Sequence, residues 1–224
     1  MSASINRRTF MRVAATGAGL GVLGQSSVAS GVRAPSDMVR VGIMGVNGRG
    51  NALAQSFARI AGSEVTYICD VDSRAVTKTI AAVSESRNGS SLQQRRPTGV
   101  TDVRRVLDDP DVDALVIAAP DHWHAPATIM ALQAGKHVYV EKPCSHNARE
   151  GELLVEAQRK YDRVVQMGNQ QRSAPRSIEI IQEIRDGLIG RPYYARAWYA
   201  NTRGTIGHGQ IAPVPEWLDY ELWQ

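Results

Sequence analysis

"VGIMGVNGRGN", residues 41–51, joins an apolar run to a helical pattern through a glycine-rich turn. A dinucleotide-binding turn needs glycine at its tightest point, where backbone approaches the pyrophosphate, and where the helix meets the strand. Gly45 and Gly50 suit the first and third roles, and Asn47 stands at the second. The stretch therefore predicts a strand, a phosphate-binding turn and a helix. The alternative is a tight turn that binds nothing.

Asn47 departs from the glycine expected at its position, but asparagine tolerates left-handed backbone better than most residues. Gly48 adjoins it, so the backbone could still approach a phosphate, and Arg49 follows. The N-terminus of the next helix would offer free N–H groups to the phosphates. We assign residues 45 and 47–50 to cofactor binding.

Apolar runs alternate with helical patterns after this turn. Strands are predicted at 38–45, 64–70, 113–120, 136–140 and 163–168, and helices at 50–62, 73–83, 102–107, 122–134, 147–160 and 174–187. Residues 86–98 are predicted to form a polar loop. Such alternation indicates an α/β fold, a doubly wound parallel Rossmann sheet covered on both faces.

The sequence divides into three predicted parts: a leader at 1–29, a dinucleotide-binding domain at 30–170, and an incomplete substrate or oligomerisation domain at 171–224. The aromatic stretch at 191–205 predicts a strand, which would begin a second α+β domain. Because the chain stops soon afterwards, we expect that this domain is cut short.

The leader is typical of an export signal. Arg7-Arg8 resembles a twin-arginine motif, and Ser27-Val28-Ala29 fits a cleavage site. The apolar stretch 13–24 is too short to span a bilayer. We expect export to the periplasm and no membrane anchor after cleavage; the alternative is a basic tail.

Charge and cysteine content argue against a nucleic-acid-binding protein and against a disulfide-stabilised fold. The formal net charge of +4 falls to 4 − 3 = +1 without Arg7, Arg8 and Arg12, so charge gives no support for nucleic-acid binding. Cys69 and Cys144 are too few for a disulfide framework.

Asp70 ends the second predicted strand, twenty residues after Gly50. A carboxylate at this place accepts hydrogen bonds from a ribose diol and repels a 2′-phosphate. The cofactor is therefore predicted to be NAD, with NADP left open because Arg74 lies close in sequence.

Polar clusters follow the later strands, and the carboxyl ends of parallel strands share one edge. Pro120, His122 and Trp123 are assigned to the cofactor, and Trp123 and His124 to the substrate. The two histidines do not share a helical face, and with no third ligand at a suitable spacing we predict no metal site. After the last strand, Gln170 and Arg172 could reach a substrate or form a polar hinge.

Taken together, Gly45-x-Asn47-x-x-Gly50, Asp70, the cluster at 120–124 and Glu141-Lys142-Pro143 resemble the Gfo/Idh/MocA oxidoreductases. The resemblance covers about residues 38 to 224. It implies a sugar or polyol substrate and a homo-oligomer in the full-length form. It implies that Lys142 lies beside the nicotinamide and the substrate hydroxyl, that Glu141 holds the cofactor or that lysine, and that Pro143 shapes the turn, often through a cis peptide.

In this family a second domain supplies a catalytic histidine, and His208 is the only later histidine here. We name it with Lys142 as a catalytic candidate, and Tyr199, Asn201 and Arg203 as residues that could line a substrate face. Two alternatives stay open. The chain could be an inactive nucleotide-binding fragment, or a relative that uses NAD to oxidise a sugar transiently and eliminate its aglycone.

Overall fold

The computed structural model describes residues 38–86, 95–200, 204–205 and 207–224. The predicted leader and the candidates Asn201 and Arg203 lie outside these residues, and what was predicted for them stays a prediction. Among the described helices, none combines the length and apolar character that crossing a bilayer requires.

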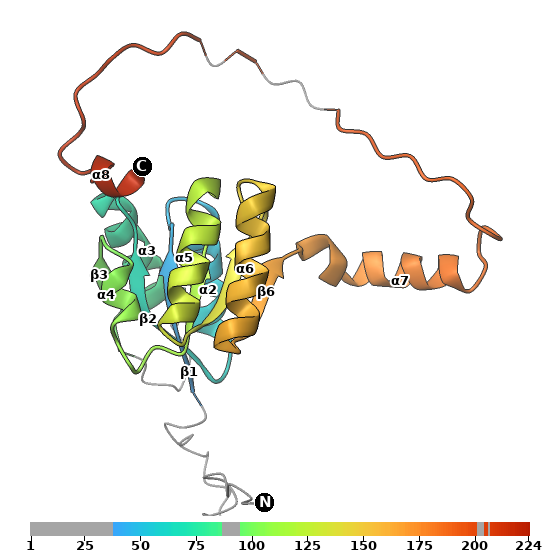
Figure 1. Ribbon diagram of the computed structural model, residues 1–224, viewed down its shortest axis with the longest axis horizontal. Coiled ribbons are helices and arrows are strands. Elements are labelled where there is room, and N and C mark those ends of the chain that lie inside the picture. The colour runs from blue at the N-terminus through green and yellow to red at the C-terminus, as the bar shows by residue number, and fades with distance from the viewer. Residues whose placement is uncertain (1–37, 87–94, 201–203, 206) are drawn as a thin grey trace, which may run out of the picture. The chain divides into compact units, whose positions relative to one another are not determined.

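Six parallel strands form one sheet in the order β3-β2-β1-β4-β5-β6, which confirms the predicted doubly wound α/β fold (Figure 1). The strands are β1 (Val39–Met44), β2 (Ser63–Cys69), β3 (Thr98–Val100), β4 (Ala114–Ile117), β5 (His137–Glu141) and β6 (Val165–Gly168). β1 lies in the middle of the sheet, with Ile43 opposite Ile68 of β2 and Val116 of β4. The short edge strand β3 was not predicted.

Helices cover both faces of the sheet. The covering helices are α2 (Arg49–Arg59), α3 (Ser73–Ser86), α4 (Arg104–Leu107), α5 (Asp121–Gln133) and α6 (Ala148–Tyr161). The later helices α7 (Pro175–Arg185) and α8 (Tyr220–Trp223) and the 3₁₀ helix η2 (Gln170–Ser173) contain no buried residue. Alternate strand residues face opposite ways. Ile43 and Val116 belong to the core beneath α2 and α3, whereas Met44 and Ile117 belong to the core beneath α5 and α6.

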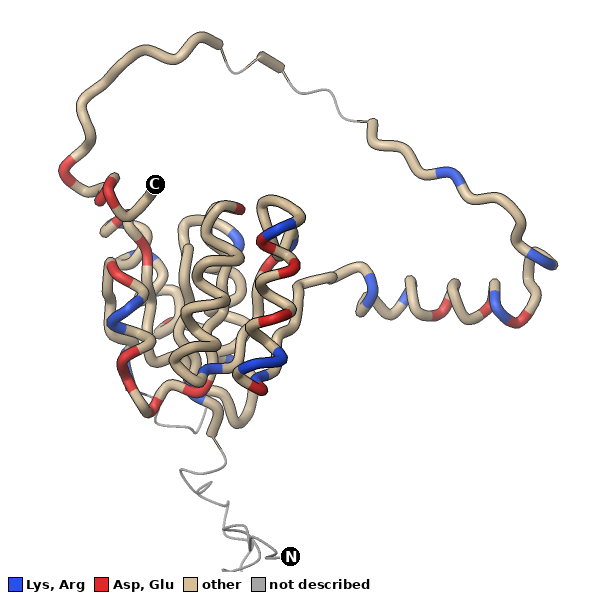
Figure 2. The backbone as a smooth tube through the Cα atoms, viewed as in Figure 1, with Lys and Arg blue, Asp and Glu red and all other residues tan. Residues whose placement is uncertain are grey.

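α5 and α6 cover the same face of the sheet, and α5 is the more deeply buried of the two helices. In α5, Ala125, Ala131 and Leu132 are fully buried, and no Asp, Glu, Lys or Arg lies between the ends of the helix. α6, by contrast, carries acidic and basic residues along its length (Figure 2). The predicted start of α6 is confirmed, because the side chain of Asn147 accepts a hydrogen bond from the Glu150 N–H.

The segment after β6 differs from its prediction in two respects. α7 forms, but Ile178 and Ile181 of its predicted core face are 57% and 47% exposed. The strand predicted for 191–205 is absent from the described residues 191–200, where Tyr193 is 97% exposed. A strand needs a neighbour that takes up its N–H and C=O groups, and this segment enters no strand pairing in the described part of the chain.

Candidate cofactor site

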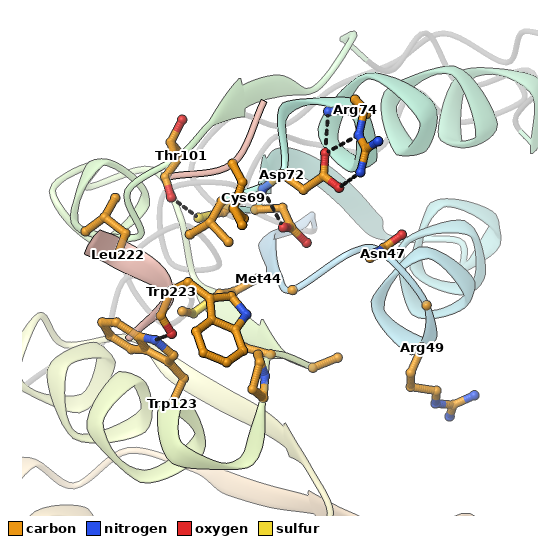
Figure 3. A pocket seen from close by; sticks show the side chains of 18 of the residues that line it. Met44, Asn47, Arg49, Cys69, Asp72, Arg74, Thr101, Trp123, Leu222 and Trp223 are labelled. Carbon is orange, nitrogen blue, oxygen red and sulfur yellow. Dashed lines mark hydrogen bonds and ion pairs between the residues drawn. The ribbon is translucent and has the colours of Figure 1, made fainter. Parts of the chain in front are cut away.

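A cavity of about 530 Å³ lies at the carboxyl ends of β1, β2 and β4 (Figure 3). This is the point where the strand order reverses, and dinucleotides bind at such points in open α/β sheets. The predicted cofactor residues Gly45, Asn47, Gly48 and Arg49 line it from the first turn, and Asp70 from the end of β2. Pro120 and Trp123 line it from the start of α5.

The turn after β1 requires glycine at two positions. Gly45 has a φ of +80°, and a Cβ there would collide with the backbone of Ala119. A Cβ on Gly50 would collide with the carbonyl oxygen of Gly45. Because both residues lack a Cβ, α2 can begin directly against the turn and close to the end of β4.

The N-terminus of α2 suits the phosphates of a dinucleotide. Gly48 is its N-cap, no side chain caps the helix, and no acidic residue lies in its first turn. Nothing lies within 4 Å of the place where a Cβ of Gly48 would stand. The backbone N–H groups are therefore open to an anion, and the residues present fit the cofactor. The left-handed backbone considered for Asn47 is not used, because Asp162 alone among the described non-glycine residues has a positive φ.

Asp70 connects two turns at the cavity wall. One carboxylate oxygen accepts the Val46 N–H at 2.6 Å, and the other accepts the Asp72 N–H at 2.9 Å. A carboxylate has about four lone-pair sites, so two remain for ribose hydroxyls. The carboxylate is thus oriented by backbone N–H groups while it keeps capacity for a ligand.

Glu141, at the end of β5, holds neighbouring segments together. It is 5% exposed and accepts hydrogen bonds from Arg49 Nε at 2.9 Å and Gln170 Nε2 at 2.6 Å. Burial raises the pKa of Glu141, but these two hydrogen bonds, the charge of Arg49 and the Lys142 backbone N–H together outweigh it, so the pKa lies below its ordinary value. The side chain of Arg49, predicted to bind the cofactor, points away from the cavity (Figure 3) and pairs with Glu141 instead.

His124 was predicted to contact the substrate, and the structure corrects this prediction because the side chain is buried. The residue is 2% exposed, one ring nitrogen contacts the carbonyl oxygen of Pro143, and the other lies 2.8 Å from that of Ala119. Neither nitrogen is free for a substrate. His124 instead connects the end of β4 to the turn after β5, where Lys142 is exposed and its peptide bond to Pro143 is cis.

The segment from Trp217 to Trp223 was missed by the prediction. Trp217, Leu218, Leu222 and Trp223 line the cavity. The side chain of Asp219 caps α8 by accepting the Leu222 N–H, a pairing of acid and helix start that the sequence does carry. Its position over the cavity could not be deduced from local pattern.

Arg172, His208 and His122 are not among the residues that line the cavity. Arg172 is exposed in η2, and His208 is exposed in a segment without helix or strand. The ring of His122, predicted to bind the cofactor, contacts the carbonyl oxygen of Trp223 at 2.8 Å. The described residues contain no cluster of three or more side chains suited to a metal.

Comparisons with known proteins agree with this geometry. Residues 39–169 match the GFO_IDH_MocA family, described as "Oxidoreductase family, NAD-binding Rossmann fold". A glycosyl hydrolase family 109 protein of Saccharopolyspora erythraea is 31% identical over 256 residues, which cover 96% of this chain and 55% of that protein. An alpha-N-acetylgalactosaminidase of Shewanella oneidensis is 27% identical over 176 residues, 75% of this chain and 37% of that protein.

Among solved structures, myo-inositol dehydrogenase from Lactobacillus casei, in complex with NAD(H) and myo-inositol, aligns with a TM-score of 0.59 at 24% identity. The alignment covers 69% of this chain and 43% of that chain. The likeness shows a shared fold. The chain spans about half the length, or less, of these two curated relatives and of the solved structure.

Two glycine substitutions separate folding from cofactor binding. We expect Gly50→Ala to lower the melting temperature and abolish NAD binding, because its Cβ collides with the turn itself. Gly48→Ala should keep the wild-type melting temperature but weaken NAD binding about tenfold, a typical cost of overpacking. Thermal unfolding and calorimetric titration measure the two effects. Unchanged NAD affinity in Gly48→Ala would contradict the placement of the pyrophosphate.

The contribution of Glu141 to stability is expected to depend on pH. Its folded pKa lies below the ordinary 4.5, so its contribution is present above that pH and is lost as the pH falls through the folded pKa. Glu141→Gln should cost about 1.5–3 kcal/mol at pH 7, the range for hydrogen bonds to charged groups. The difference from wild type should shrink below pH 4.5.

Urea unfolding at several pH values measures this difference. Glu152→Gln is the matched control, because Glu152 pairs with Arg149 on the surface, where ion pairs contribute about 0–1 kcal/mol. Equal stability of the Glu141 variant and the control at pH 7 would show that Glu141 does not hold the edge together.

Proposed function

Because the chain belongs to the Gfo/Idh/MocA family of NAD-binding oxidoreductases, we propose that it supplies the nucleotide-binding part of an enzyme that oxidises a hydroxyl group of a sugar or polyol. One observation carries the proposal. The cavity with Asp70 and the uncapped start of α2 lies at the carboxyl edge of the sheet, and Lys142 follows β5 at that same edge.

The cofactor is bound and oriented by the chain's own residues. The free N–H groups at the start of α2 face the pyrophosphate, and Asp70 accepts hydrogen bonds from the ribose. A 2′-phosphate beside this carboxylate is repelled, so NAD is preferred to NADP. Bound NAD supplies the hydride acceptor.

Lys142 accepts or relays the proton of the substrate hydroxyl. Its neighbours support the role, because Glu141 is anchored by two hydrogen bonds and the carbonyl of Pro143 contacts His124. The amine is therefore carried on a turn that is fixed on both sides. Trp123, which lines the cavity, offers an apolar wall to a sugar ring.

Replacing Lys142 by methionine tests its role. In a full-length version of the protein, Lys142→Met should lower turnover by about 100- to 10,000-fold, the usual contribution of a general base. The dissociation constant for NAD should not change, because the turn after β1 and Asp70 hold the dinucleotide. Lys78→Met is the control, since Lys78 is exposed on α3 away from the edge. Near-normal turnover of Lys142→Met would make the lysine structural.

A second candidate function is favoured by the curated relatives, two of which are named as a family 109 glycosyl hydrolase and an alpha-N-acetylgalactosaminidase. In a glycosidase of this kind the hydride leaves a sugar carbon in the first step, the aglycone is eliminated and water is added, and the hydride returns in the last step. NAD is then not consumed.

The two candidates differ in one measurable product. A dehydrogenase accumulates NADH with free sugars or polyols, whereas a glycosidase releases p-nitrophenol from p-nitrophenyl N-acetylgalactosaminide without net NADH. We expect NADH absorbance to rise with at least one sugar or polyol in a panel. Release of p-nitrophenol at constant NADH would replace the first proposal with the second.

A further inference from the structure

The segment 217–223 is attached to the turn between β2 and α3. The Ser73 N–H donates to the carbonyl oxygen of Trp217 at 3.0 Å, and the Asp219 N–H donates to that of Val71 at 3.0 Å. Between them, Asp72 and Leu218 form an antiparallel bridge. The backbone of Trp217 is thus fixed beside the turn that begins α3.

The other end of the segment is attached to α5. The carbonyl oxygen of Trp223 lies 2.8 Å from Nε2 of His122 and accepts the Trp123 indole N–H at 3.3 Å. The rings of His122 and Trp223 meet edge to face, with centroids 5.5 Å apart. Because both attachment sites border the cavity, the segment forms one of its walls (Figure 3).

Arg74 is held in this wall by two residues. Its Nε and Nη2 donate to the two carboxylate oxygens of Asp72 at 3.0 and 2.9 Å, and its guanidinium carbon lies 3.2 Å from the centroid of the Trp217 ring. The hydrogen bond from Arg74 lowers the pKa of Asp72 more than burial raises it, so the pair is charged at neutral pH. One edge and one face of the guanidinium are therefore engaged.

The charges around this part of the cavity disfavour another phosphate. Asp70, Asp72 and Arg74 all line the cavity, and two carboxylates with one guanidinium sum to −1. A phosphate monoester carries about −1.5 to −2 at pH 7. An arginine near the ribose accommodates such a group when its donor fork is free. Here Asp72 occupies the Nε–Nη2 edge of Arg74 and Trp217 covers one face, so only the Nη1 side of the guanidinium keeps donors for a phosphate.

We propose that Asp72 and Trp217 are positioning residues that withhold Arg74 from a ribose 2′-phosphate and so set the preference for NAD over NADP. The inference rests on the proposed NAD-dependent function and adds the segment 217–223 to the cofactor site. Selectivity follows from where Arg74 is held, and its presence near the ribose does not by itself favour NADP.

Asp72→Asn is the first test, because asparagine keeps the oxygen that accepts the Arg74 backbone N–H at the start of α3 and removes the charge. Calorimetric titration of the 224-residue chain gives the dissociation constants for NAD⁺ and NADP⁺. The NAD⁺/NADP⁺ affinity ratio should shift toward NADP⁺ by about tenfold, the value of one hydrogen bond to a charged group. The double variant Asp72→Asn with Arg74→Ala should lose this gain.

Trp217 provides an independent test that does not touch the ion pair. Trp217→Ala should shift the ratio in the same direction, whereas Trp217→Phe, which keeps an aromatic face, should retain the wild-type ratio. A merely structural role would change both dissociation constants equally and leave the ratio unchanged.

The outcomes separate this inference from the function on which it rests. A wild-type chain that binds neither dinucleotide overturns the proposed function together with the inference. If the wild type binds NAD⁺ and the ratio is unchanged in Asp72→Asn and Trp217→Ala, the inference alone is wrong. A gain of NADP⁺ affinity that persists without Arg74 also overturns it, because another group would then bind the phosphate.

Discussion

All six strands run in the same direction, so every strand delivers its last residue to the same edge of the sheet. Residues as distant in sequence as Gly45, Asp70 and Glu141 meet there for this reason alone. A parallel sheet buried on both faces leaves this edge as a place where polar side chains can be tolerated. The polar groups at the edge largely satisfy one another: Asp70 accepts from the turn after β1, and Glu141 accepts from Arg49 of α2. The phosphate-binding turn is therefore held from both neighbouring sides.

The features that were predictable from sequence are those whose cause is local. Apolar runs indicate the long strands, and Gly45 and Gly50 stand where backbone contacts leave no room for a Cβ. β3 escaped prediction because three residues, with one apolar side chain among them, carry no periodic signal. The strand expected after residue 190 has aromatic residues of high strand propensity, but propensity acts only where a neighbouring strand is present.

The features that were not predictable depend on distant partners. Whether His124 faces a substrate or the interior depends on Pro143, nineteen residues away, whose carbonyl takes up a ring nitrogen. The wall at 217–223 depends on contacts such as that of Ser73 with Trp217, across a separation of 144 residues. Arg49 belongs to the glycine turn in sequence, yet its partner is an acid on β5. The positions of the motifs in the sequence predicted which residues gather at the edge of the sheet. Which residues they bond to there depends on the folded structure.

The arrangement of aromatic residues has an optical consequence. Three of the four tryptophans, Trp123, Trp217 and Trp223, line one cavity, whereas Trp198 is 77% exposed in a segment without helix or strand. The emission band of indole overlaps the absorption band of reduced nicotinamide. A reduced dinucleotide in the cavity would therefore quench the emission of these three tryptophans by energy transfer. The protein thus carries its own reporter of occupancy and of cofactor redox state, without any added label.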